Sequence, residues 1–307
     1  MKKNRMRTEK SPDFTVTTDQ ADRRLDRVLR GLYPDVPLGA IMKAMRKGAV
    51  RVNGAKSDGA TRLDAGDVVS VPWVVLRPDR PKTLDSARVG QAKRVTALKT
   101  LLRTDDLWCL EKPAGLLSQP DSKGGDSVIT RAWAELSWER DDFRPALIGR
   151  LDRNVSGVVV IALNAPVLRL LSSLVRDGLV RKIYRAVVFG TPPPAGAIDL
   201  RVAKDARTNR VLAGDGGQDA LTRYRVLRSG KKFSLVELDL VTGRPHQARI
   251  HLSSIGHPIA GDFKYGGGKG ARIFLHACSL SLPEGLPHYL RGLTIVSPPP
   301  DEFESML

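Results

Sequence analysis

Side chains that could act as a nucleophile, a base or a proton relay stand in short polar segments between apolar runs. Asp152 lies between two arginines in the segment Gly149–Gly157 (GRLDRNVSG), which leads into the apolar run VVVIAL. An aspartate with its ordinary pKa of about 3.9 is an anion at neutral pH, so it can act as a nucleophile or a base. A loop carboxylate between two arginines is more often a salt bridge, so this segment alone does not indicate an active site.

Three further polar segments accompany it along the chain. KPAGLL at 112–117 follows a strand-like run, KIY at 182–184 opens another, and 240–252 (LVTGRPHQARIHL) is dense in polar and charged side chains. The run 256–262 (GHPIAGD) and Tyr265 come next. A tyrosine can pack its ring on a base and relay a proton through its hydroxyl. These segments are candidates for parts of one site.

The apolar pattern after residue 98 predicts the elements that must position these side chains. Strand-like runs are LWCLEK, GVVVIAL, YRAVVFG, SLVELDL and RIFLHACSLSL, and helix-like runs are SVITRAWAEL and APVLRLLSSLVRDG. Strands outnumber helices and lack the regular alternation of a parallel doubly wound fold. We therefore predict an α+β domain with a mostly antiparallel sheet.

The first part of the chain has a different pattern and a different charge. Apolar residues recur at helical spacing over 25–32 and again over 41–45, and Asn53-Gly54 in AVRVNGAKS is a strong hairpin signal. The whole chain carries a net charge of +17, and residues 1–100 hold 22 basic against 11 acidic side chains. Such an excess indicates a polyanionic partner, most simply nucleic acid, although a solubilising surface without a partner stays an alternative.

Other protein classes are excluded by composition. The two cysteines, Cys109 and Cys278, are too few and too far apart for a disulfide scaffold or a cysteine-based zinc cluster. No apolar run approaches the roughly 20 residues of a membrane span, and no apolar stretch follows the basic start. His246 and His251 are five residues apart, which suits neither strand nor helix ligand spacing, so they predict satisfied polar residues and no metal site. We expect a cytoplasmic protein.

The first part of the chain resembles the S4 RNA-binding domain. The matching residues are Arg24-Leu25-Asp26, Lys47-Gly48, 50–54 (VRVNG) and 65–69 (AGDVV). The resemblance implies a small module that lays one basic helical face on structured RNA. The residues expected to contact RNA are Arg23, Arg24, Arg27, Lys43, Arg46, Lys47 and Arg51. A solvated basic face without RNA is the alternative.

The second part, from about residue 101 to 300, resembles the RluA-type pseudouridine synthases. The four polar segments carry the resemblance in their order and spacing, and it continues into Leu275-His276-Ala277 and Ser297-Pro298. With an S4-like module in front, the similarity is to the large-subunit ribosomal RNA branch of that family. The expected organisation is a flexible basic tail over 1–21, an S4-like domain over 22–76, a linker over 77–98 and a catalytic domain over 99–307.

The resemblance implies isomerisation of uridine to pseudouridine in RNA, without a cofactor and without a metal. It implies that Asp152 is the catalytic aspartate, Tyr184 the active-site tyrosine and Arg249 the arginine that pairs with the aspartate. Three routes stay open for the aspartate: attack at C1′, addition at C6, or base catalysis toward a glycal.

The resemblance also implies a set of substrate-contacting side chains. Ile250 would wall the uracil pocket, and Arg150 and Arg153 would contact phosphates or the gap left by the flipped nucleotide. Lys112 would bind the RNA backbone or brace the fold, and the brace is favoured. The expected partner is ribosomal RNA, in a pre-ribosomal particle, bound by a monomer.

Two positions depart from the family, and two other functions stay open. Gly149 stands where the family usually has His, and Val155 where it usually has Thr. Neither supplies the catalytic group, so the departures bear on loop geometry and on the choice of uridine. The main alternative is a non-catalytic RNA-binding ribosome assembly factor on the same fold, and a DNA-binding protein is a second.

Overall fold

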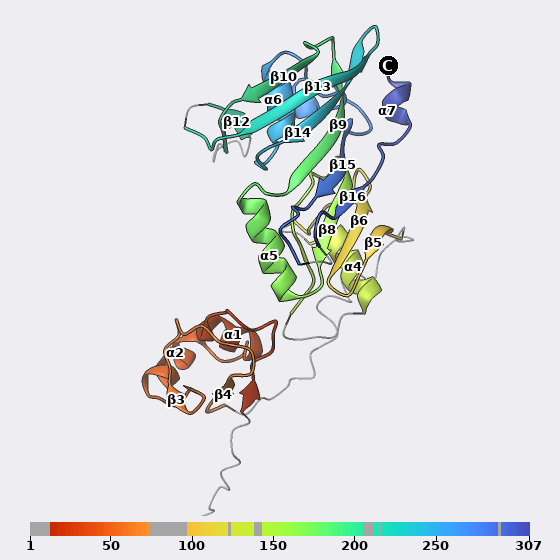
Figure 1. Cartoon of the computed structure of the whole chain (residues 1–307). Helices are drawn as coiled ribbons and strands as arrows, with labels where there is room; N and C mark the ends of the chain where they lie inside the picture. The colour runs from red at the N-terminus through yellow and green to blue at the C-terminus, as the bar shows by residue number, and fades with distance from the viewer. Residues whose placement is uncertain are drawn as a thin grey trace, which may run out of the picture. The chain divides into compact units, whose positions relative to one another are not determined.

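The structure is a computed structural model, and it describes residues 13–73, 97–121, 124–137, 143–204, 211–214, 216–287 and 290–307. The chain divides into two compact units. The first is formed chiefly by residues before 91, together with the short segments 138–144 and 164–166, and the second by the remaining residues (Figure 1).

The described residues of the first unit form two helices and a four-stranded antiparallel sheet in the order β1-β4-β2-β3. Its elements are β1 Phe14–Thr15, α1 Leu25–Leu32, α2 Leu38–Arg46, β2 Arg51–Val52, β3 Ala55–Lys56 and β4 Val68–Ser70. The predicted hairpin turn is present, since Asn53 and Gly54 between β2 and β3 both adopt positive φ, 50° and 79°. Buried Leu25, Leu29 and Ile41 give this unit a core of its own.

The predicted flexible tail over 1–21 is wrong for its second half. Strand β1 pairs with β4 through Phe14 and Val69, and Val16 is buried in the core of the first unit. Both hydrogen-bonding and apolar burial therefore fix this segment, although its short polar sequence shows no period. Residues 1–12, and all of the predicted linker except its last two residues, lie outside the described residues.

The described residues of the second unit form a ten-stranded sheet in the order β10-β13-β14-β9-β15-β8-β6-β5, with β16 on β15 and β7 on β8. Among these strands only β15 and β8 pair in parallel. A separate hairpin joins β11 to β12. The strands are β5 Lys99–Arg103, β6 Leu107–Lys112, β7 Ala146–Leu147, β8 Ser156–Ala162, β9 Arg181–Phe189, β10 Ala195–Asp199, β11 Val202–Lys204, β12 Val211–Ala213, β13 Leu221–Ser229, β14 Phe233–Leu240, β15 Leu275–Ser281 and β16 Thr294–Val296.

The helices of the second unit include both that the sequence predicts. They are α4 Val128–Leu136, α5 Ala165–Arg176, α6 Gln247–Ser254, the 3₁₀ turn η1 Phe263–Tyr265 and α7 Glu302–Ser305. Ser127 caps α4 in a capping box with Thr130. Helix α6 was not predicted, because its polar residues hide the helical period. Within the described part of the chain, no helix has the length and hydropathy that a membrane crossing requires.

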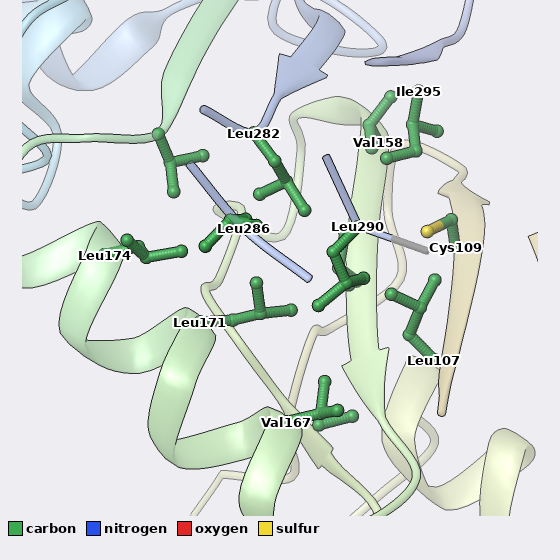
Figure 2. Close-up of a cluster of buried hydrophobic side chains, with 13 residues drawn as sticks. Leu107, Cys109, Val158, Val167, Leu171, Leu174, Leu282, Leu286, Leu290 and Ile295 are labelled. Atoms are coloured by element: carbon green, nitrogen blue, oxygen red, sulfur yellow. The ribbon is translucent and has the colours of Figure 1, made fainter. Parts of the chain in front are cut away.

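Strand β8 is buried on both faces, which explains its unbroken apolar sequence. Val158 and Val160 pack with α5 residues such as Leu171, whereas Val159 and Ile161 pack in the cluster that holds α4. Figure 2 shows the first of these clusters, where side chains from α5 meet those of β6, β8 and the segment between β15 and β16. The strand that leads out of the Asp152 loop is thus fixed from two sides.

Candidate active site

The loop that carries Asp152 lies between β7 and β8 and is clamped to the turn after β6. The Ser118 hydroxyl donates to the Leu151 carbonyl at 2.7 Å and accepts from the Leu151 amide at 3.0 Å. The Gly115 amide donates to the Arg153 carbonyl at 2.8 Å, and Arg153 Nε donates back to the Gly115 carbonyl at 3.0 Å. These paired bonds fix the backbone on both sides of Asp152.

Lys112 braces this clamp. Its side chain is fully buried, and Nζ donates to the carbonyl oxygens of Pro113, Leu116 and Arg153 at 2.8, 2.7 and 3.0 Å. All three ammonium donors are therefore used inside the protein. Burial lowers the pKa of Lys112 to about 7, with Asp152 opposing the shift. These contacts support the bracing role of Lys112, and its binding to RNA stays a prediction.

The structure at the end of the Asp152 loop shows why residue 157 is glycine and why valine fits at position 155. Gly157 has φ of 118°, and a Cβ there would lie 2.3 Å from the Ala277 carbonyl oxygen, so the parallel β8–β15 joint requires glycine. Val155 is buried in an apolar cluster, where a valine is well accommodated. A Cβ at exposed Gly149 would meet nothing within 4 Å, so packing does not require glycine at this position.

Arg249 joins two carboxylates across the site. From α6, its Nη1 donates to Asp152 Oδ2 at 2.7 Å, while Nε and Nη2 donate to Asp262 Oδ2 and Oδ1 at 2.7 and 2.8 Å. Asp262 is 1% exposed and Arg249 is 8% exposed, but Asp152 is 31% exposed. Asp262 therefore anchors the guanidinium, and the guanidinium holds the one carboxylate that solvent reaches.

The charges around Arg249 keep its guanidinium protonated. Burial alone would lower the pKa of Arg249, but hydrogen bonds and charge from Asp262, followed by those from Asp152, more than offset it, so the net shift is upward. The guanidinium carbon also lies 5.0 Å from the centre of the Tyr265 ring. Arg249 is thus a fixed cation in the site.

His246 faces the second oxygen of Asp152. It precedes α6 with φ of 56°, an unusual conformation for a residue other than glycine. Its Nδ1 lies 2.7 Å from the Tyr265 hydroxyl, and its Nε2 lies 3.7 Å from Asp152 Oδ1. Burial lowers the pKa of His246, although the charge of Asp152 opposes the shift, so the ring is neutral at pH 7.

Tyr184 lies on β9, the strand next to β15. Burial raises the pKa of Tyr184, and the negative charge of Asp152 adds to the shift, followed by Cys278. The phenol is consequently neutral at physiological pH and can donate a proton but not act as an anion. Tyr184 and Leu151, the neighbour of Asp152, pack against the same apolar cluster, which contains Val155 of the Asp152 loop.

The remaining predicted site residues have different surroundings. Ile250 is buried in a small apolar cluster with Val202 and Ala220, and Tyr265 packs against this cluster. Ile250 therefore helps to fix the position of Tyr265. Arg150 is exposed in the catalytic loop, and Arg153 is exposed but donates to the Gly115 carbonyl. The contacts of Ile250, Arg150 and Arg153 with the substrate stay predictions.

A chain of buried polar side chains begins at Ser156, where the Asp152 loop enters β8. His276 on β15 is fully buried, with Nδ1 at 2.8 Å from Ser156 Oγ and Nε2 at 3.0 Å from the Ser297 carbonyl. The Ser156 hydroxyl also accepts from Arg272 Nη2. Since a carbonyl can only accept, the neutral His276 with its proton on Nε2 satisfies both neighbours. His251 on α6 is buried in the same manner, as the sequence predicted for a satisfied polar residue.

We expect the free energy of unfolding to fall as the pH is lowered below about 6.5. Burial lowers the pKa of both His276 and His251 below this ordinary value. The unfolded chain therefore takes up protons first as the pH falls, so the stability present above about pH 6.5 is lost toward the folded pKa values, at up to about 1.4 kcal/mol per pH unit for each histidine.

Urea unfolding at pH 7.5, 6.5 and 5.5 measures this dependence, and His276→Gln is the matched variant. The midpoint of the wild type should drop chiefly between pH 6.5 and 5.5, and that of His276→Gln should drop less over the same interval. A midpoint independent of pH in the wild type would contradict the assignment of neutral buried histidines.

Comparison with known proteins gives the family. A profile of the RNA pseudouridylate synthases matches residues 106–254, a stretch that contains Asp152, Tyr184 and Arg249. The chain is 32% identical over 276 residues to ribosomal large subunit pseudouridine synthase C of Vibrio vulnificus, with 86% of each chain covered. The chain belongs to the RNA pseudouridylate synthase family. It is also 33% identical over 274 residues to the Rickettsia conorii protein of the same name, covering 85% of this chain and 89% of the relative.

Solved structures support the same fold. The chain matches human RNA Pseudouridylate Synthase Domain Containing 4 with a TM-score of 0.56 and 25% identity, over 72% of this chain and 93% of that one. The α+β pseudouridine synthase fold with a mostly antiparallel sheet, predicted from the sequence, is thereby confirmed. As a member of this family, the pseudouridine synthase is an isomerase that acts on RNA.

Three residues of the site had no role in the sequence analysis. His246 was read as a satisfied polar residue, and Asp262 and Tyr265 were noted without a function. Sequence spacing does not reveal His246 either, because it precedes α6 in a left-handed conformation and so shares no helix face with Arg249. Nothing in the sequence signals that Asp262 anchors Arg249, because the two meet only through the fold.

Proposed function

We propose that this pseudouridine synthase isomerises uridines of large-subunit ribosomal RNA through Asp152. The observation that carries the proposal is the Asp152 carboxylate, solvent-accessible yet held at Oδ2 by the buried Arg249–Asp262 pair. Asp152 Oδ2 is engaged at 2.7 Å, whereas the nearest partner of Oδ1 among the described residues is His246 at 3.7 Å. Oδ1 is therefore the oxygen available to the substrate.

The proposed reaction divides between Asp152 and Tyr184. The bond from N1 of uracil to C1′ of the ribose breaks, the base rotates, and a bond from C5 to C1′ forms while C5 loses its proton and N1 gains one. Asp152 supplies the anion for the first step by any of the three routes above. To Tyr184, which burial keeps neutral, we assign the transfer of a proton to or from the base.

The choice of RNA rests on the relatives and on the first unit. Relatives named ribosomal large subunit pseudouridine synthase C align over most of the chain. We infer that the first unit is an S4-like RNA anchor and that the protein works in the cytoplasm on ribosomal RNA, including pre-ribosomal particles. Of the seven basic residues assigned to this unit, all but the half-buried Arg23 are exposed, and Arg24 is paired with Asp26.

Neutralising two exposed residues of α2 should weaken RNA binding and flatten its salt dependence. Lys43→Gln with Arg46→Gln removes two cations from one helix face, so affinity for a large-subunit rRNA fragment should fall roughly tenfold at moderate salt, with the slope of log affinity against log salt reduced by up to about 2. Filter binding from low to high salt measures both quantities. Arg176→Gln with Lys231→Gln removes the same charge from exposed sites of the second unit and is the control. Equal losses in the two double variants would mean that the first unit is no anchor.

Mapping pseudouridines in ribosomal RNA from cells with and without the gene tests the proposed function. Loss of one or more large-subunit pseudouridines, restored by the wild-type chain but not by Asp152→Asn, is the expected result. An unchanged map, with a ribosome assembly defect that Asp152→Asn restores, would favour the non-catalytic assembly factor.

A further inference from the structure

The aromatic side chain of Phe263 is exposed to solvent next to residues of the candidate active site. Phe263 is 70% exposed, the highest fraction among the large apolar side chains of the described residues. Single exposed apolar residues are common, so exposure alone carries no conclusion. The position is what distinguishes Phe263, because it opens the 3₁₀ turn η1, whose flanks hold the site: Asp262 binds Arg249, and Tyr265 binds His246.

Cationic side chains accompany this ring. Lys269 Nζ lies 5.6 Å from the centre of the Phe263 ring, and the next residue in the turn is Lys264, whose Nζ lies 5.7 Å from the Tyr265 ring. The Lys269 ammonium lies over one face of the Phe263 ring, and the side chain is still 70% exposed. Aromatic rings that stack on bases, with cations nearby for the phosphates, are the combination by which proteins hold single-stranded nucleic acid.

The turn that presents Phe263 is held in place. The Gly267 amide donates to the Asp262 carbonyl at 2.8 Å, and the Gly261 amide donates to the Gly267 carbonyl at 2.8 Å. A Cβ at Gly267 would lie 1.7 Å from the Ile259 carbonyl oxygen, so the chain packs too closely there for any side chain. These contacts order the turn around Gly267.

We propose that Phe263 stacks on an unpaired base of the RNA next to the target uridine, while Lys269 and Lys264 contact its phosphates. Within one turn, Asp262 binds Arg249, Tyr265 binds His246 and Phe263 faces solvent. The Phe263 ring therefore meets a neighbour of the target uridine and not the target itself. Extruding a nucleotide from a stack leaves its neighbours with an unsatisfied face, which the ring covers. The proposal rests on the proposed function, since it takes the RNA substrate from it.

The test compares Phe263→Leu with Phe263→Trp on a large-subunit rRNA fragment. Phe263→Leu keeps an apolar side chain but loses the flat face, so the dissociation constant should rise roughly tenfold, and Phe263→Trp should restore it. The single-turnover rate at saturating RNA should stay within about twofold of wild type, because the ring does not touch the reacting atoms. Leu179→Ala, at a side chain 54% exposed elsewhere in the same unit, is the control.

A second variant tests the cation. Lys269→Gln should lower the slope of log affinity against log salt by about 1, whereas Lys231→Gln should leave it unchanged. An affinity of Phe263→Leu within twofold of wild type, or a loss that Phe263→Trp does not restore, would overturn the stacking site. A wild-type enzyme that binds this RNA through Phe263 yet forms no pseudouridine would instead refute the proposed function and leave the stacking site standing.

Discussion

Asp152→Asn should abolish pseudouridine formation while RNA affinity stays within about twofold of wild type. The amide keeps the size of the carboxylate and can still accept the bond from Arg249 Nη1, so the loop should keep its place. It carries no negative charge, so neither nucleophilic attack nor proton removal is available. A loss of roughly 10²–10⁴-fold or more in the single-turnover rate is expected.

The rate and the affinity should be measured separately, by chromatography of digested RNA and by filter binding. Asp177→Asn is the control, because that carboxylate is 53% exposed and forms a salt bridge with its neighbour Arg176. A rate for Asp152→Asn within tenfold of wild type would remove Asp152 from the reaction.

Arg249→Met should damage both the catalytic rate and the stability. The rate should fall strongly because Asp152 loses the donor that aims it, whereas RNA affinity should change less, since binding is dominated by backbone charges. Stability should fall as well, because Asp262 is 1% exposed and both its oxygens accept from Arg249. A buried charge left without its partner costs about 3–5 kcal/mol.

A second substitution separates the two effects of Arg249→Met. Adding Asp262→Asn removes the stranded charge, so the melting temperature should recover in part while the rate stays low. Arg249→Lys should restore activity only partly, because lysine cannot donate to Asp262 through two nitrogens and to Asp152 through a third. If Arg249→Met weakened RNA binding but left the saturated rate intact, Arg249 would be an RNA contact.

The sequence predicts the parts of this fold that local pattern controls. Alternation and apolar runs found the main strands of the sheet, and spacing found α4 and α5, because those signals depend on neighbours along the chain. The apolar run of β8 carries no alternation, so the sequence could not predict which element covers each face. In the structure, α5 packs on one face and α4 on the other. Helix α6 was missed because its buried face includes Gln247, Arg249 and His251, all polar.

The candidate site was predictable as a set of segments but not as a geometry. The pairing of Asp152 with Arg249, which the family resemblance implied, joins residues 97 positions apart. The anchoring of Arg249 by Asp262 and the approach of His246 to Asp152 depend on how η1 and α6 pack, and no spacing in the sequence encodes that contact. The sequence left two roles open for Lys112, an RNA contact or a brace of the fold. Its three carbonyl partners favour the brace.

Release of tritium from large-subunit rRNA transcribed with 5-³H-uridine tests the central claim most directly. Forming the bond from C5 to C1′ expels the hydrogen at C5, so each turnover liberates one label into water. We predict that the wild-type chain releases tritium in proportion to the amount of pseudouridine found in the same RNA. Asp152→Asn should release none above background. No release by an RNA-binding wild-type chain, or equal release by Asp152→Asn, would contradict it.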